Sequence, residues 1–147
     1  MRRLGFVSVA FLCLAGSASA QPIEQVVREF GFTGRWAYLC DRAVSLDNWQ
    51  RRIEISTTRI AWTDDCGGCQ YAQIKYVILS ATLPAANRMA LRVRREDGPK
   101  GTYDFEIIKT DGKIRTVLNQ PLDGDTLVRD GVILRSKQET PWFAKCP

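Results

Sequence analysis

The sequence contains no histidine. This absence excludes Ser-His-Asp and Cys-His catalytic arrangements and the usual histidine-bearing metal sites. A glycine-rich phosphate loop is also missing, and no motif places two carboxylates across a cleft, as glycoside hydrolysis requires. The run DGDTLVRDG does not fit a calcium loop, because Leu127 stands where the third oxygen ligand is needed. No residue set therefore argues for an enzyme, and the sequence implies no cofactor and no metal.

Long apolar runs are nearly absent as well, and the first twenty residues differ from the rest. Residues 1–20 combine a basic start at Arg2 and Arg3, an apolar run over residues 4–14 and small residues at 18–20. This pattern is typical of a secretory signal peptide and is too short for a membrane span. We therefore expect a bacterial protein that is exported to the periplasm or secreted.

The remaining segment, residues 21–147, is expected to be a single domain. It shows no repeat, linker or low-complexity tract, and no apolar run approaches the roughly 20 residues needed to cross a bilayer, so it should not span a membrane. Its 127 residues carry 19 basic and 16 acidic side chains, a net charge of +3. Such a small excess gives no case for a nucleic-acid partner.

Four cysteines remain once Cys13 is assigned to the signal peptide: Cys40, Cys66, Cys69 and Cys146. An even number of cysteines in an oxidising compartment favours two disulfides, which can be connected in three ways. Our prediction is Cys40–Cys146, which ties the early chain to its end, together with Cys66–Cys69.

The motif Cys66-Gly-Gly-Cys69 also allows a redox or metal interpretation. A thioredoxin-like site begins a helix, whereas the residues that follow this motif are typical of a strand. The carboxylates of Asp64 and Asp65 would raise a nearby thiol pKa, and Gln70 stands where haem attachment needs histidine. A zinc site would need a second close cysteine pair. We therefore interpret the motif as a disulfide across a turn.

Hydrophobic periodicity predicts one helix followed by strands. Apolar residues at helical spacing favour a short helix that begins near Pro22 and ends at Gly31. From Trp36 onward the period becomes two, which is typical of half-buried antiparallel strands. The alternating apolar positions are Ile53 and Ile55, Ile60 and Trp62, Met89, Leu91 and Val93, and Tyr103, Phe105 and Ile107.

Asp-Gly pairs separate several of these segments, at Asp111-Gly112, Asp123-Gly124 and Asp130-Gly131. This dipeptide favours the turns that join hairpins. The last pair lies between TLVR and VILR, which we predict to be strands. The sequence therefore predicts an all-β fold, a small antiparallel up-and-down barrel of about eight strands with a short N-terminal helix.

Basic residues concentrate at Arg51-Arg52 and in the segment RVRR. On strands, Arg92 and Arg94 would project from one outer face, near Lys75, and could form a binding strip for an anionic glycan, a lipid headgroup or an acidic protein. The simpler interpretation is a solvated sheet face that discourages edge aggregation.

The segment FTGRWAYLC resembles the Gly-x-Trp opening strand of the lipocalin and calycin barrels, and with the ending TPWFAKC it is similar to small exported bacterial barrels. The resemblance implies that Trp36 packs at one barrel end against a basic residue from the last strands. Arg135 and Lys145 are the candidates for that cation–π contact.

Three functions remain open at this point. The first is a periplasmic binding or envelope-associated module, with a small ligand in the barrel mouth or a polymer on the basic face. The second is a proteinaceous inhibitor of a lysozyme or protease. The third is a thiol oxidoreductase that uses Cys66 and Cys69.

Overall fold

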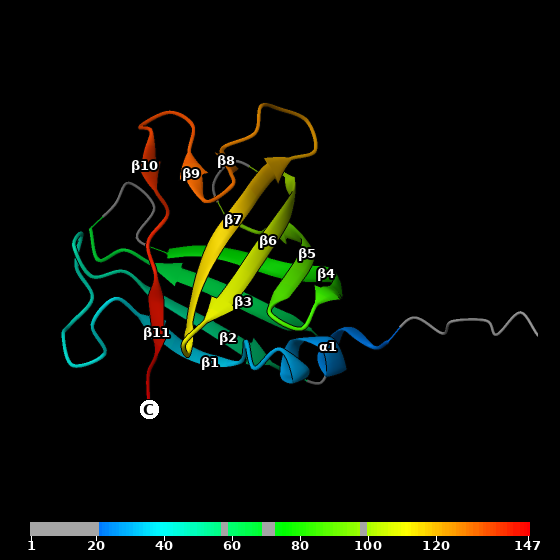
Figure 1. Ribbon diagram of the computed structural model, residues 1–147, viewed down its shortest axis with the longest axis horizontal. Helices are drawn as coiled ribbons and strands as arrows, with labels where there is room; N and C mark the ends of the chain where they lie inside the picture. The colour runs from blue at the N-terminus through cyan, green and yellow to red at the C-terminus, as the bar shows by residue number, and fades with distance from the viewer. Residues whose placement is uncertain (1–20, 57–58, 69–72, 98–99) are drawn as a thin grey trace, which may run out of the picture.

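The computed structural model describes residues 21–56, 59–68, 73–97 and 100–147 (Figure 1). This part of the chain contains one short helix, α1 (Ile23–Glu29), and eleven strands. The seven strands that follow the helix are β1 (Gly34–Ala37), β2 (Gln50–Ile55), β3 (Ile60–Asp65), β4 (Gln73–Ala85), β5 (Arg88–Arg95), β6 (Thr102–Thr110) and β7 (Lys113–Pro121). The last four are β8 (Val128–Arg129), β9 (Val132–Ile133), β10 (Gln138–Glu139) and β11 (Phe143–Lys145).

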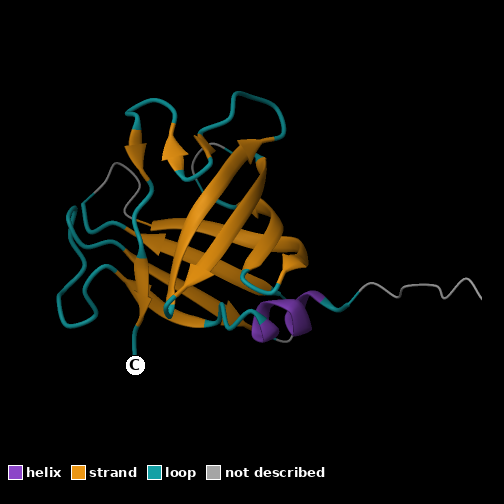
Figure 2. Cartoon of the chain, viewed as in Figure 1, coloured by secondary structure: helices purple, strands orange, loops and turns teal. Residues whose placement is uncertain are grey.

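Eight of these strands form a closed antiparallel barrel (Figure 2). Strands β1 to β7 pair in sequence order, and β11 lies between β7 and β1 and completes the ring. Every strand in the ring therefore has a neighbour on both sides, and the barrel has no free sheet edge. The predicted fold class, an antiparallel barrel of about eight strands with a short helix, is confirmed.

The last part of the chain differs from the prediction in one respect. The segments TLVR and VILR contain only the two-residue strands β8 and β9, which extend from the end of β7 and are not part of the ring. Their tight hairpin has Asp130 and Gly131 at positive φ, so the chain reverses after two residues on each side. The strand that closes the ring is instead β11, which is only three residues long.

The barrel interior is filled from the strands by the predicted alternation. Met89, Leu91 and Val93 of β5 are all buried, as is Trp62 of β3. The helix covers one end of the barrel: Val26 of α1, with Phe30 and Phe32 just after it, belongs to the same buried cluster. Lys109, near the end of β6, donates a hydrogen bond to the carbonyl oxygen of Phe30, which fastens the helix to that end.

The opposite end of the barrel carries the additional strands. In the β6–β7 hairpin, the turn at Asp111 and Gly112 lies on the helix side, as Lys109 shows by its contact with Phe30. Both turn residues have positive φ, in agreement with the hairpin turn that this dipeptide favours. Strand β8 pairs with β7 at Asn119, near the far end of that hairpin. Figure 1 shows β8, β9 and β10 at the end of the barrel away from α1. The two ends therefore differ: one is closed by a helix, and the other lies beneath short strands and loops.

Candidate ligand cavity at the open end of the barrel

A cavity of about 480 Å³ lies at the end of the barrel opposite α1. Its walls are mainly apolar and come from several strands and from the segment that joins β1 to β2. The principal apolar lining residues are Trp49, Ile74, Phe105, Val128, Ile133 and Phe143. Both the volume and the apolar lining are typical of a site for a small organic molecule.

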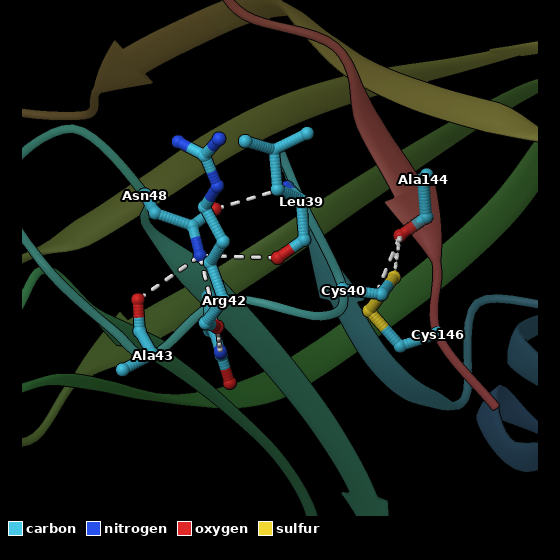
Figure 3. The surroundings of a disulfide bond; sticks show 8 residues. Leu39, Cys40, Arg42, Ala43, Asn48, Ala144 and Cys146 are labelled. Atoms are coloured by element: carbon cyan, nitrogen blue, oxygen red, sulfur yellow. Dashed lines mark hydrogen bonds between the residues drawn. A yellow bond between two sulfur atoms is a disulfide. The ribbon is translucent and has the colours of Figure 1, made fainter.

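One side of this cavity is formed by residues 38–49, which we call the mouth loop. Its ends place Tyr38 and Trp49 on the cavity wall. Asn48 organises the loop from within and is 3% exposed. Its amide oxygen accepts a hydrogen bond from the Leu39 N–H at 2.9 Å, and its amide nitrogen donates to the carbonyl oxygens of Leu39, Arg42 and Ala43 (Figure 3). A single buried side chain thus satisfies four backbone groups and defines the loop conformation.

A disulfide between Cys40 and Cys146 fixes the mouth loop to the end of β11. The two Cα atoms are 5.3 Å apart, and the bond joins positions 106 residues apart in sequence. This is the pairing predicted from the sequence. Figure 3 shows the bond beside Ala144 and close to the hydrogen bonds of Asn48. The mouth loop is therefore held both covalently and by a buried amide.

The floor of the cavity contains an ion pair between Arg51 of β2 and Asp64 of β3, which are directly opposite across the two strands. Arg51 Nε lies 2.7 Å from Asp64 Oδ1, and Nη2 lies 3.1 Å from Oδ2. The indole N–H of Trp62 donates to the same Oδ1 at 2.6 Å. The carboxylate therefore accepts three hydrogen bonds, and the pair carries no net charge.

The guanidinium of Arg51 also lies between two aromatic rings. Its central carbon is 4.3 Å from the ring centroid of Trp62 and 4.8 Å from that of Phe143. Arg51 is only 6% exposed. Stacking and pairing thus compensate a buried charge that would otherwise be costly. The result is a rigid, neutral polar floor beneath apolar walls.

Two tyrosine hydroxyls, one amide oxygen and Nη1 of Arg51 in the cavity lining lack hydrogen-bond partners among the described residues. Among the described residues, no group forms a hydrogen bond with the hydroxyl of Tyr38 or Tyr76, or with the buried Oδ1 of Asn119. Burial raises the pKa of Tyr38 to about 12, and it also raises the pKa of Tyr76. Both phenols are therefore neutral at physiological pH and can donate a hydrogen bond to a ligand, while Asn119 can accept one.

The predicted binding strip lies on the outer face of the barrel, away from this cavity. Lys75, Arg92 and Arg94 are all exposed on β4 and β5. Arg92, however, forms a two-point ion pair with Asp104 of β6 at 2.8 and 3.0 Å. Its hydrogen bond holds the pKa of Asp104 below its usual range. Arg92 therefore has a partner within the protein, whereas neither Lys75 nor Arg94 forms an ion pair in the described part of the chain.

Trp36 lies in the barrel core, at the end covered by the helix. Its indole N–H donates to the Phe32 carbonyl oxygen at 2.8 Å. The ammonium of Lys145 is 5.5 Å from the centre of its ring, so one of the two proposed cations occupies the expected position. Arg135, the other candidate, is exposed in the turn between β9 and β10.

The Cys66-Gly-Gly-Cys69 motif follows β3 at a corner of the barrel. Cys66 is buried and disulfide-bonded, whereas Cys69 lies outside the described residues, so its pairing with Cys66 stays a prediction. Gly67 has a φ of +59° and packs against the mouth loop. Glycine is required at position 67 because the backbone of the mouth loop passes close to it. The motif therefore has a structural role at this contact.

The inward-facing pair Arg51–Asp64 was not predicted from the sequence. The signal was available in the period-two pattern, because Arg51 shares a strand face with Ile53, and Asp64 shares one with Trp62. We considered Arg51 only together with Arg52, as a concentration of basic residues, and charged residues are rarely buried. Each of the two adjacent strands carries a charged residue at a position that alternation assigns to the barrel interior. Two such residues of opposite charge indicate a buried ion pair.

Comparison with known proteins gives no match to a family model, a curated protein or a solved structure. Within the described residues, no group of three or more acidic, cysteine or histidine side chains is arranged to hold a metal ion. The same part of the chain contains no helix that is long and apolar enough to cross a membrane.

Proposed function

We propose that this protein is an exported binding module that holds a small, largely apolar molecule in the open end of the barrel. The observation that carries the proposal is the apolar cavity of about 480 Å³ in which the hydroxyls of Tyr38 and Tyr76 face no protein partner. Polar groups inside an apolar site normally find hydrogen bonds, so these positions suit the polar end of a ligand. The ligand would be uncharged, since Arg51 and Asp64 compensate each other and the carboxylate of Glu139 pairs with Arg115.

Export rests on the residue pattern of positions 1–20, and the Cys40–Cys146 disulfide supports it because such bonds persist in oxidising compartments. A relationship to the lipocalin-like barrels is likewise a proposal. What supports it is the Gly-x-Trp sequence at Gly34 and the contact between Trp36 and Lys145.

A fluorescent probe tests the cavity directly. N-phenyl-1-naphthylamine is neutral and apolar, and its emission rises when it enters a dry site. We expect saturable binding that is abolished by Ile133→Trp, because the larger ring fills the cavity. Leu127→Trp is the matched control, since it adds the same ring at an exposed position on the same segment. Equal binding by both variants would refute the proposal.

A second probe tests the polar groups. Prodan is of similar size and carries a ketone oxygen that can accept a hydrogen bond from a phenol. Tyr76→Phe should weaken prodan binding by about tenfold and leave the affinity for N-phenyl-1-naphthylamine unchanged. Tyr103→Phe, which removes a hydroxyl outside the cavity lining, is the control. An identical effect of Tyr76→Phe on both probes would show that this hydroxyl takes no part in binding.

A further inference from the structure

The cavity at the open end of the barrel is aromatic along the side that the barrel itself supplies. Its aromatic lining residues are Tyr38, Trp49, Tyr76, Phe105 and Phe143. Three of them belong to strands of the ring, β4, β6 and β11. The other two stand at the ends of the mouth loop, directly beyond the paired positions Ala37 and Gln50 of β1 and β2. We call these five residues the aromatic wall.

The rings of the aromatic wall are joined through the barrel core. The ring centroids of Tyr38 and Phe143 are 4.8 Å apart, and those of Tyr76 and Trp62 are 5.1 Å apart. The guanidinium of Arg51, which lies between the rings of Phe143 and Trp62, connects these two pairs. Because these groups support one another in a close-packed core, the wall presents a firm surface to a ligand.

Trp49 differs from the other rings of the wall. Among the described residues, no aromatic ring or cation stacks with its indole, whereas each of the other rings has such a partner. The side chain is partly exposed and borders the cavity. Its N–H donates to the Leu46 carbonyl oxygen at 3.0 Å, which orients the ring. Aromatic rings gain from stacked or edge-to-face contacts beyond the area that they bury. The indole is therefore available for such a contact with a ring of the ligand.

The other side of the cavity is aliphatic. Val128 of β8, Ile133 of β9 and Pro141, which lies between β10 and β11, line it. We call residues 128–141 the cover segment, and Figure 1 shows its strands at the end of the barrel away from α1. No hydrogen bond or ion pair between described residues joins the cover segment to the mouth loop. The cavity thus lies between an aromatic and an aliphatic surface, and a flat molecule can contact both surfaces at once.

The aromatic side of the cavity is also preorganised. The Cys40–Cys146 disulfide and the hydrogen bonds of Asn48 hold the mouth loop in place. A rigid ligand loses little conformational freedom in such a site, whereas a flexible chain must be ordered when it binds. We propose that the ligand is a flat aromatic molecule that stacks on Trp49. This inference rests on the proposed function, because it names the class of molecule that the barrel cavity takes.

Two ketones with the same number of carbon atoms, 2-acetylnaphthalene and 2-dodecanone, test this inference. Both are neutral and carry one carbonyl oxygen, but only the first contains flat rings. Burial of apolar area alone would favour 2-dodecanone, because its saturated chain is the more apolar of the two. We expect 2-acetylnaphthalene to bind more tightly by about tenfold, because it can stack and has little conformational freedom to lose. Equilibrium dialysis with the oxidised protein measures both affinities.

Trp49→Leu tests the stacking position, since leucine keeps an apolar side chain and removes the ring. It should reduce the preference for 2-acetylnaphthalene from about tenfold to about twofold or less. Trp49→Phe, which restores a ring, should retain most of the preference. Trp142→Leu is the matched control, because Trp142 stacks with Arg115 and is not part of the cavity lining. That variant should leave the preference unchanged.

Several results would overturn the inference. Equal or tighter binding of 2-dodecanone by the unchanged protein would leave the cavity as a site for a flexible chain and refute the aromatic class. An equal loss of both ketones in Trp49→Leu would mean that the indole only shapes the cavity. Ile133→Trp should abolish the binding of both ketones, and unchanged binding in that variant would place them outside the cavity. If neither ketone nor N-phenyl-1-naphthylamine bound, the proposed function would fail, and this inference would fail with it.

Discussion

Gly67 lies so close to Ser45 that a side chain at position 67 would collide with the mouth loop. A Cβ atom placed there would come within 2.7 Å of the backbone nitrogen and Cα of Ser45. Neither atom can move without shifting the loop itself. The corner that follows β3 and the loop that borders the cavity are therefore packed backbone to backbone.

Gly67→Ala should consequently destabilise the protein by more than about 2 kcal/mol, because positive φ and a backbone clash act together. Gly112→Ala is the matched control: its φ is +71°, but no atom lies within 4 Å of the added carbon. That variant should cost only about 1 kcal/mol. Urea unfolding of both variants gives the comparison, and equal losses would contradict the close approach.

The buried ion pair makes a prediction about coupling. Arg51→Met or Asp64→Leu alone should cost about 3–5 kcal/mol, because each leaves an uncompensated charge in the core. The double variant should cost clearly less than the sum, since no charge is then stranded. A double-mutant cycle measured by urea unfolding checks this. Additive losses would mean that the two charges do not depend on each other.

Asn48 should be the most sensitive position of the mouth loop. Asn48→Ala removes the partner of four backbone groups and should lower the free energy of unfolding by about 2–4 kcal/mol. Asn87→Ala, at an exposed turn between β4 and β5, should change it by less than about 0.5 kcal/mol. Chemical denaturation measures both, and similar small effects would show that the loop does not need its central amide.

The disulfide should contribute to global stability. Its 106-residue separation gives about 4–5 kcal/mol in the chain-entropy model, and removal of a native disulfide typically costs about 2–5 kcal/mol. The variant Cys40→Ser/Cys146→Ser should lose a free energy of unfolding in that range. It should also show faster hydrogen exchange over residues 38–49, because the mouth loop loses its covalent attachment. If hydrogen exchange over residues 38–49 did not change, the disulfide would stabilise the protein only by restricting the unfolded chain.

Alkaline pH should destabilise the protein through its buried tyrosines. Burial raises the pKa of Tyr38 to about 12 in the folded state, against about 10 in an unfolded chain. The unfolded chain then releases its proton first, so stability is fully present below pH 10 and is lost as the pH rises towards 12. Tyr38→Phe should reduce the loss over that interval. Urea unfolding at several pH values, with phenolate absorbance as a second readout, tests the assignment.

Most of the fold could be predicted because the strands carry strong local signals. Val26 and Phe30, which are four residues apart, indicate the helix by their spacing. Met89 and Leu91 illustrate the alternation that indicates the strands of the barrel wall. Strand β11 escaped prediction because three residues are too few to show a period. Its role depends on pairing with β1 and β7, which are distant in sequence. A local pattern carries no information about such partners.

The sites were less predictable for a related reason. The position of Arg51 at the cavity floor depends on the register between β1 and β2, and the mouth loop that joins these strands is too long to be assigned a turn type. The cavity depends on Val128 and Ile133, which lie in strands too short to be placed from the sequence.

The proposed Cys66–Cys69 bond can be tested by a non-reducing peptide map.

The pairing of β1 with β11 determines when the barrel can close. Strand pairing places Trp36 opposite Lys145 and so joins segments that are far apart in the sequence. Until residue 145 has left the ribosome, β1 and β7 each have an unpaired edge, and the barrel cannot close. A chain that lacks β11 therefore stays open between β1 and β7, however well its other strands pair.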